Sequence, residues 1–221
     1  MIEPQIKIHL GDCMEAMAKM PDNAYDLAIV DPPYGIGEDG GKGVRTSPSR
    51  PNSYKRKPKY KAKGWDNKVP DKEYFNELIR VSKNQIIFGA NHFIENIPNA
   101  NSSCWIVWDK KNEGTDFADC ELAWASFKTT VRKYTVHKFL GTRGGKDCIH
   151  PTQKPVALYK WLLRNYAKEG DKILDTHGGS MSIALACHDM NFDLELWELD
   201  PEYYNAGLKR FNDYKAQLRI W

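Results

Sequence analysis

The tetrapeptide Asp31-Pro32-Pro33-Tyr34 directly follows the largely apolar run 26–30, and it limits the folds open to this chain. An apolar run of this length predicts a buried strand, and two consecutive prolines end it abruptly. Proline also holds the preceding residue in extended geometry, so an acid, a stiff turn and an aromatic ring share one strand end. Ligands of open α/β sheets bind at such ends, which makes the tetrapeptide a candidate site; the alternative is a Pro-Pro turn with a packed tyrosine.

The first thirty residues predict a βαβ unit, with a strand over 5–10, a helix over 14–20 and a strand over 25–30. Such a unit implies a parallel sheet, so the Gly11-Asp12 turn and Asp31 should lie at the same sheet edge. Asp12 is therefore a second candidate, and this role is compatible with capping the following helix. Later patterns predict helices over 71–82, 156–166, 181–190 and 201–218, and strands over 85–88, 105–108, 121–127, 172–175 and 192–197. We expect a single α/β domain spanning residues 1–221.

A basic loop, residues 41–63, contains nine Lys or Arg and no acid, whereas the rest of the chain carries 23 basic against 29 acidic residues. Cations interleaved with aromatic rings are typical of a segment that meets phosphates and stacks on bases; the alternative is a solvated loop. A second basic surface segment, residues 128–146, could also contact a polyanion. The candidate nucleic-acid contacts are Lys42, Arg45, Arg50, Lys55, Arg56, Lys57 and Lys59 in the loop, and Arg132, Lys133 and Arg143 in the second segment.

Residues 35–40 match the dinucleotide-binding pattern G-x-G-x-x-G and follow a predicted strand. That fingerprint requires a helix to open at the third glycine. Pro48, Pro51 and Pro58 prevent a helix from starting between residues 41 and 58, so we reject this interpretation.

A second constellation follows the predicted strand 172–175, where Thr176-His177-Gly178-Gly179-Ser180 leads into a helix. A small-residue turn before a helix lets backbone N–H groups approach a ligand closely. Glu198 ends the next strand roughly twenty residues later, a spacing that places an acid to accept hydrogen bonds from ribose hydroxyls. The sequence therefore predicts a nucleoside-binding site, with a helix-sheet packing turn as the alternative.

The apolar runs are far too short to span a bilayer, and residues 5–10 alternate like a strand rather than a secretory leader. We expect a cytoplasmic protein without a membrane partner. The five cysteines include no Cys-x-x-Cys pair, and an odd number cannot all pair within the chain. This favours reduced thiols and argues against a zinc site.

In motif order, the chain resembles the DNA amino-methyltransferases of the β arrangement, in which the catalytic motif precedes the cofactor motifs. The resemblance covers most of the length and is carried by Gly11-Asp12, Asp31-Pro32-Pro33-Tyr34, His150-Pro151-Thr152-Gln153-Lys154-Pro155, Ile173-Leu174-Asp175 with Gly179-Ser180, and Glu198-Leu199-Asp200-Pro201-Glu202-Tyr203-Tyr204. It implies a circularly permuted, Rossmann-like class I methyltransferase fold. The sheet would be mostly parallel and seven-stranded, with helices on both faces and the two termini close together.

The same resemblance implies S-adenosylmethionine as cofactor, double-stranded DNA as partner, no metal ion, and a bacterial or phage-encoded protein; a homodimer is left open. Asp31, Pro32, Pro33 and Tyr34 would be catalytic. The residues that would hold the cofactor are Asp12, Cys13, Asp31, Thr152, Gln153, Lys154, Asp175, Thr176, His177, Gly178, Gly179, Ser180, Glu198 and Leu199.

The tetrapeptide begins with Asp, which favours adenine N6 as the target because the family's cytosine-N4 enzymes usually begin it with Ser. Cytosine N4 stays open, as does a catalytically weak DNA-binding relative. Enzymes that modify RNA or a protein amide use similar tetrapeptides, but their glycine turn normally precedes the tetrapeptide. One departure from the family pattern is Met181, which follows Gly178-Gly179-Ser180 where the family commonly has glycine. Its side chain is expected to narrow the backbone approach to the cofactor.

Overall fold

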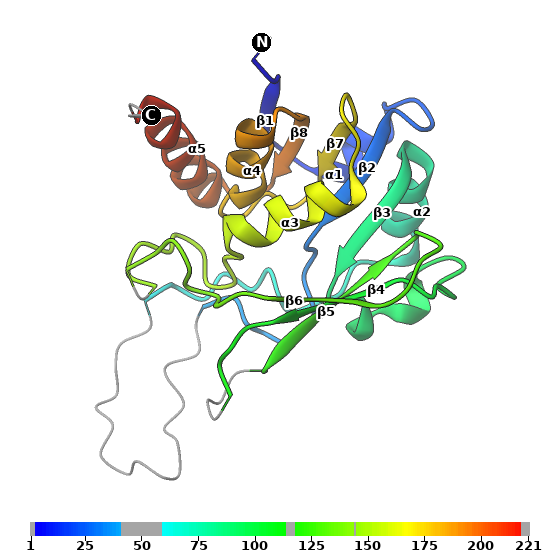
Figure 1. The fold of residues 1–221 in the computed structure, drawn as a ribbon, viewed down its shortest axis with the longest axis horizontal. Coiled ribbons are helices and arrows are strands. Elements are labelled where there is room, and N and C mark those ends of the chain that lie inside the picture. The colour runs from blue at the N-terminus through cyan, green and yellow to red at the C-terminus, as the bar shows by residue number, and fades with distance from the viewer. Residues whose placement is uncertain (1–2, 41–58, 114–117, 144, 218–221) are drawn as a thin grey trace.

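The computed structural model describes residues 3–40, 59–113, 118–143 and 145–217. The described strands form one sheet of eight, in the order β1-β8-β7-β2-β3-β5-β4-β6 (Figure 1). Neighbours from β1 to β3 are parallel, and β5 is antiparallel to both β3 and β4. The strands are β1 (Ile6–Leu10), β2 (Tyr25–Val30), β3 (Ser82–Phe88), β4 (Trp105–Asp109), β5 (Cys120–Ala125), β6 (Arg132–Thr135), β7 (Lys172–Asp175) and β8 (Asp193–Glu198).

The predicted mostly parallel α/β sheet is confirmed, but the expected count of seven strands is wrong. The eighth strand is β6, which lies inside the second basic segment and was not predicted. It pairs in parallel with β4 at the sheet edge, from Ile106 opposite Arg132 to Asp109 opposite Thr135. Four residues that begin with two exposed cations carry little apolar periodicity, so pairing with β4 rather than local pattern determines this strand.

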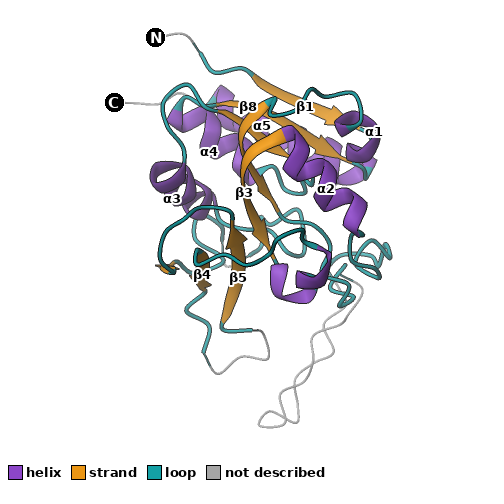
Figure 2. Ribbon diagram, turned by 90° about the vertical axis from the view of Figure 1, so that its right-hand side faces the viewer, coloured by secondary structure: helices purple, strands orange, loops and turns teal. Residues whose placement is uncertain are grey.

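The first and the last strand of the chain are neighbours in the sheet. β1 pairs in parallel with β8, the last strand in the sequence, which is the arrangement expected of a permuted sheet. The two ends of the described chain also meet, because Lys215 Nζ, near the C-terminal end, lies 2.9 Å from Glu3 Oε1, near the N-terminal end. Figures 1 and 2 show β1 and α5 at the same side of the molecule. The predicted proximity of the two ends is confirmed for the described residues.

Helices cover both faces of the sheet, as Figure 2 shows. Along β2, Leu27 and Ile29 pack with α3 and α4, whereas Ala28 and Val30 pack with α1 and α2. Successive residues of a strand point to opposite faces, so a strand covered on both faces reads as a continuous apolar run. The helices are α1 (Cys13–Met17), α2 (Lys72–Val81), α3 (Val156–Tyr166), α4 (Ser182–Met190) and α5 (Pro201–Ala216), with the short 3-10 helices η1 (Ala90–His92) and η2 (Ile94–Asn96).

The helix starts follow the sequence closely, and one helix end does not. α1 ends at Met17 rather than at residue 20, because the Met20 N–H donates to the Met17 carbonyl and tightens the last turn. Among the described residues, no helix has the length and apolarity needed to cross a membrane. Aspartate side chains cap three helices by accepting backbone N–H bonds: Asp12, Asp71 and Asp200.

Candidate active site

Four neighbouring parallel strands bring the predicted acids to one edge of the sheet. β1 and β8 end side by side, where the Gly11 N–H donates to the Glu198 carbonyl at 3.0 Å. Asp175 is the last residue of β7, and Asp31 directly follows β2. The strand order β1-β8-β7-β2 therefore places Asp12, Glu198, Asp175 and Asp31 in sequence along this edge.

A buried aspartate holds the tetrapeptide turn in shape. Asp66 Oδ1 accepts the backbone N–H groups of Tyr34 and Gly35 at 2.7 and 2.9 Å, and its Oδ2 accepts that of Glu38 at 2.7 Å. Each of these N–H groups would otherwise lack a strand partner, because the prolines have just ended β2. Asp66 was not among the predicted site residues, since no local pattern indicates a contact between residues 32 positions apart.

The Tyr34 side chain is fixed at both its hydroxyl and its ring. The hydroxyl donates to Asp31 Oδ1 at 2.7 Å. The ring lies against the backbone of Gly89, where an added Cβ atom would come within 2.1 Å of it. The exposed His92 stacks on the same ring, with centroids 5.1 Å apart and planes inclined by 17°. A flat ring therefore already lies on Tyr34 in this structure.

Lys154 lies against the Asp31 carboxylate. Its Nζ is 2.5 Å from Asp31 Oδ2, 3.1 Å from Glu121 Oε2 and 3.3 Å from the Tyr34 hydroxyl. Lys110 Nζ lies 2.7 Å from the other Glu121 oxygen. Asp31, Lys154, Glu121 and Lys110 form what we call the buried charge cluster. Glu121 and Lys110 were not among the predicted site residues.

Burial and neighbouring charge oppose each other throughout this cluster. Burial raises the pKa of Asp31 above its ordinary value, and the Lys154 ammonium counteracts that rise. Burial acts in the same direction on Glu121, but Lys154 and Lys110 outweigh it and lower the Glu121 pKa to about 2. Burial alone would lower the pKa of Lys154, yet the two carboxylates raise it. Glu121 and Lys154 are therefore both charged near neutral pH.

The two glycines of the turn have different roles, close packing at Gly178 and a backbone hydrogen bond at Gly179. A Cβ atom at Gly178 would lie 2.3 Å from Leu196 Cδ2, so this glycine allows close packing on β8. The Gly179 N–H donates to Glu198 Oε2 at 2.7 Å. The turn was predicted either to bind a nucleoside or to pack a helix on the sheet. Gly178 has the packing role, whereas Gly179 contacts Glu198, the acid that was predicted to meet a ribose.

Met181 does not narrow the glycine turn as expected. It caps α4 in the left-handed conformation, with φ +57°, which explains why glycine would suit this position. Its side chain is fully buried and packs on α5, where an added Cβ atom at Gly207 would lie 2.8 Å from the Met181 sulfur. The methionine is accommodated by a glycine on α5, so the predicted narrowing is wrong.

Buried hydrogen bonds hold the rest of this turn. The hydroxyls of Tyr74 and Thr176 lie 2.7 Å apart, and Thr176 Oγ1 lies 2.9 Å from His177 Nδ1. The His177 N–H donates to Asp175 Oδ1 at 3.0 Å. Burial lowers the pKa of His177 to about 4, so its imidazole is neutral near pH 7. The Ser180 hydroxyl lies 3.1 Å from that of Ser182, inside the start of α4.

The segment 150–155 connects the glycine turn to the tetrapeptide. A Cβ atom at Gly179 would lie 3.7 Å from the His150 ring, which also packs against Trp65 and Tyr203 at centroid distances of 5.2 and 4.3 Å. Burial lowers the His150 pKa to about 3. Four residues later, Lys154 reaches Asp31. The segment thus spans both halves of the candidate site.

The other predicted cofactor residues lie around the same edge. Thr152 Oγ1 is 3.1 Å from His150 Nδ1, and Gln153 Oε1 accepts the Ile149 N–H at 3.1 Å, so both shape their own turn. Asp12, Cys13 and Leu199 lie at the other end of the row of acids. Asp12 accepts the Met14 N–H at 2.8 Å, Cys13 is half-buried, and Leu199 is 69% exposed.

The row of acids suits a cationic ligand. Burial raises the pKa of Asp175 to about 8, and the charges of Asp31 and Glu198 add to that rise. Burial also raises the pKa of Glu198. A positive charge placed among these carboxyls would stabilise their ionised forms, because it offsets both their desolvation and their mutual repulsion.

The predicted nucleic-acid contacts are only partly described. Lys42, Arg45, Arg50, Lys55, Arg56 and Lys57 lie outside the described residues. Lys59 Nζ donates to the carbonyls of Gly145, Lys146 and Cys148 at 2.6–2.9 Å, and its contact with a phosphate stays a prediction.

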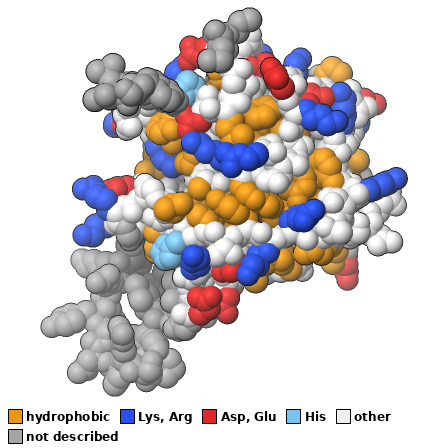
Figure 3. Space-filling view, viewed as in Figure 1, with side chains coloured by type: hydrophobic (Ala, Val, Ile, Leu, Met, Phe, Trp, Pro, Cys, Tyr) orange, Lys and Arg blue, Asp and Glu red, His pale blue; other side chains and the backbone are white. Residues whose placement is uncertain are grey.

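In the second basic segment, Arg132 is exposed on β6. Lys133 Nζ lies 3.2 Å from Asp109, and Arg143 Nη2 lies 2.7 Å from Asp147. Exposed ion pairs of this kind are weak and can exchange partners. Figure 3 shows Lys and Arg side chains spread singly over the face that carries β6, with apolar side chains between them.

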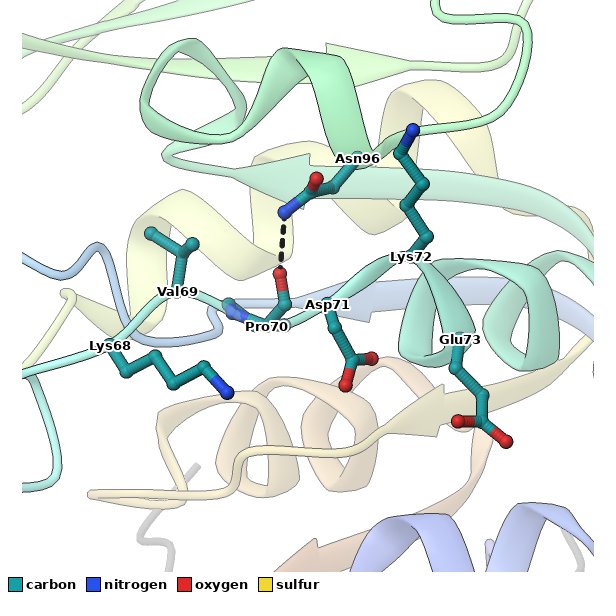
Figure 4. A pocket seen from close by; sticks show the side chains of 7 residues that line it. All are labelled: Lys68, Val69, Pro70, Asp71, Lys72, Glu73 and Asn96. Carbon is teal, nitrogen blue, oxygen red and sulfur yellow. Dashed lines mark hydrogen bonds between the residues drawn. The ribbon is translucent and has the colours of Figure 1, made fainter.

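A surface hollow of about 470 Å³ lies at the start of α2 (Figure 4). Asn96 Nδ2 closes one side by donating to the Pro70 carbonyl at 2.8 Å. Its lining mixes two cations with two acids and includes none of the predicted site residues: Lys68, Val69, Pro70, Asp71, Lys72, Glu73 and Asn96.

Comparison with known proteins adds independent information. A family model described as DNA methylase matches residues 107–209. The type II methyltransferase M2.MboI of Moraxella bovis is 23% identical, over 98% of this chain and 94% of the relative.

Two solved structures share the fold across almost the whole chain. The M1.HpyAVI-SAM complex matches with a TM-score of 0.60 at 20% identity, covering 94% of this chain and 100% of that one. The PvuII DNA methyltransferase, described as cytosine-N4-specific, matches with a TM-score of 0.56 at 13% identity, covering 96% and 93%. The fold is therefore that of the class I methyltransferases. Together with the family model and the relative, it makes this chain similar to the N6/N4 DNA amino-methyltransferases.

Proposed function

We propose that the protein transfers a methyl group from S-adenosylmethionine to the exocyclic N6 of an adenine flipped out of double-stranded DNA. The observation that carries this proposal is the position of Asp31. It lies at the sheet edge between Tyr34, on which a flat ring already stacks, and a row of acids suited to a cationic ligand. The match of residues 107–209 to the DNA methylase family model supports the same function.

The residues at the edge fit this cofactor by their chemistry. S-adenosylmethionine carries a sulfonium and an ammonium charge, and the buried Asp175 has its pKa raised to about 8 by burial beside further acids. Glu198 would accept hydrogen bonds from the ribose hydroxyls, in place of the Gly179 N–H that it now accepts. The exposed Leu199 and the half-buried Cys13 would flank the adenine. When bound, the cofactor supplies an electrophilic methyl group.

The tetrapeptide would activate the acceptor nitrogen. The lone pair of an exocyclic amino group is delocalised into the base, so the nitrogen is a poor nucleophile. Hydrogen bonds from the amino group to the Asp31 carboxylate and the Pro32 carbonyl would favour a pyramidal nitrogen and stabilise its developing positive charge. Tyr34 would stack on the base in the place that His92 occupies, since the target must leave the duplex to reach the site.

Positioning contributes the remaining rate enhancement. The amino nitrogen and the methyl group must meet in line, and rigid positioning contributes most to reactions of this kind. Asp66 fixes the turn backbone, and Gly89 lets the Tyr34 ring lie flat on the chain. The basic loop 41–63 and the second basic segment 128–146 are the proposed contacts to DNA phosphates.

Replacing Glu198 by glutamine should weaken S-adenosylmethionine binding by about 10- to 150-fold, because hydrogen bonds to a charged acceptor contribute about 1.5–3 kcal/mol. Isothermal titration calorimetry measures this directly. Glu195→Gln is the matched control, since Glu195 lies on the opposite face of β8 and accepts the Tyr25 hydroxyl at 2.9 Å. Equal affinities of the two variants for S-adenosylmethionine would show that Glu198 does not bind the cofactor.

The identity of the methylated nucleoside in the product DNA tests which base is the target. Duplex DNA methylated with radiolabelled S-adenosylmethionine and digested to nucleosides should yield N6-methyldeoxyadenosine, because the tetrapeptide begins with Asp. Recovery of N4-methyldeoxycytidine would instead support the cytosine alternative, which the likeness to the PvuII enzyme also favours. Cofactor binding without any methylated product would indicate the catalytically weak relative.

A further inference from the structure

The buried charge cluster is a chain of four alternating charges drawn from separate parts of the fold. Lys110 follows β4, Glu121 lies on β5, Lys154 precedes α3, and Asp31 follows β2. The nitrogen-oxygen distances along the chain are 2.7, 3.1 and 2.5 Å. Residues from four separate parts of the fold are therefore linked in one chain, which ends at the carboxylate that the proposed function assigns to the target amino group.

Lys154 is enclosed more completely than its partners. Its side chain is only 2% exposed, against 17% for Asp31 and 20% for Glu121. Its ammonium also lies 4.7 Å from the centroid of the Phe88 ring. An isolated ammonium would be too costly at such a place, so the two carboxylates are what keep Lys154 charged there.

The contacts to Asp31 divide its two oxygens between two donors. Oδ1 accepts the Tyr34 hydroxyl, and Oδ2 contacts Lys154. A carboxylate has about four lone-pair sites, so each oxygen keeps capacity for a further donor. The orientation of the carboxylate is thus set before an amino group arrives.

We propose that Lys154, held in place by Glu121 and Lys110, is a positioning residue that keeps Asp31 ionised and aims its carboxylate at the target amino group. This inference rests on the proposed function for the role of Asp31. Glu121 also acts on Asp31 at a distance, as a like charge that opposes its ionisation. The charge on Lys154 and the charge on Glu121 therefore have opposite effects on Asp31.

These opposite effects separate an electrostatic role from a merely structural one. Lys154→Met removes a cation, so it should move the titration of Asp31 upward by about 1–3 pH units, the size typical of an adjacent opposite charge. Glu121→Gln removes an anion and should move the titration downward. Lys154→Arg keeps the cation, so Asp31 should titrate close to its wild-type position in this variant. The other titratable groups that face Asp31 are unchanged in all three variants: Tyr34, Tyr74, Tyr159 and Asp175.

The test is a carbon-13 NMR titration of the Asp31 carboxyl in the full chain, with its signal assigned from Asp31→Asn. Lys168→Met, on the exposed turn before β7, is the matched lysine control and should leave the Asp31 titration unchanged. In the methyl-transfer assay, the acid limb of kcat against pH should follow the NMR shifts. Activity requires ionised Asp31, so the limb moves up for Lys154→Met and down for Glu121→Gln.

An unchanged Asp31 titration in both Lys154→Met and Glu121→Gln, or shifts in the same direction, would overturn the inference. Thermal unfolding of each variant identifies any that fail to fold, and Lys154→Arg and Glu121→Gln then carry the decision. The NMR titration does not depend on turnover. A wild-type protein that methylates no DNA would refute the proposed function, while the titration would still decide the role of Lys154.

Discussion

Asp31→Ala is expected to reduce methyl transfer by at least about 100- to 1,000-fold, the loss typical when a group that stabilises transition-state charge is removed. The carboxylate is assigned mainly to the target amino group, so the affinity for S-adenosylmethionine should stay within a few-fold. A radiolabelled-methyl assay and calorimetry measure the two effects separately.

Asp31→Asn is the informative companion variant. It keeps the shape of the side chain and a carbonyl oxygen for the Tyr34 hydroxyl, but it removes the charge that pairs with Lys154. Loss of activity in both variants would show that charge, rather than shape, is required. Substantial residual turnover in Asp31→Ala would show that another group activates the amino nitrogen.

Gly89→Ala should also abolish most of the activity, although residue 89 bears no functional group. Gly89 has φ +69°, and an added Cβ atom would lie 2.1 Å from the Tyr34 ring. The ring and its hydroxyl bond to Asp31 would have to move, and a shift of about 1 Å at a catalytic group can cost about 100-fold in rate. Steady-state kinetics of methyl transfer should show this as a lower kcat.

Gly170→Ala is the matched control. Gly170 has φ +85°, and an added Cβ atom there meets nothing within 4 Å. Both variants bear the backbone strain of a left-handed alanine, about 1–3 kcal/mol in the free energy of unfolding. Only Gly89→Ala should lose turnover at a temperature where both are folded. Similar kcat values for the two variants would show that Tyr34 tolerates displacement.

Some features of this protein are local properties of its sequence. Hydrophobic periods of two and 3.6 residues predict strands and helices. Acids at the carboxyl ends of parallel strands lie at one edge of the sheet for any conformation of the loops. Asp12, Asp31, Asp175 and Glu198 could therefore be assigned to one edge in advance. β6 was missed because its four residues carry no such period and are ordered by pairing with β4.

Other features depend on contacts between distant parts of the chain. Lys154 meets the tetrapeptide across 120 residues, Glu121 across 87, and Asp66 across 32. No local pattern distinguishes a lysine that will be buried against a carboxylate from one on the surface. The side chain of Met181 likewise depends on the space that Gly207 leaves on α5.

The sequence by itself determined the α/β class, the parallel edge and the acids along it, because strand periodicity and chain direction are local properties. Only the tertiary structure decided which charges surround Asp31, which backbone supports Tyr34 and where Met181 points. Ion pairing and close packing act between side chains that the fold brings together, so they are settled only when those elements meet.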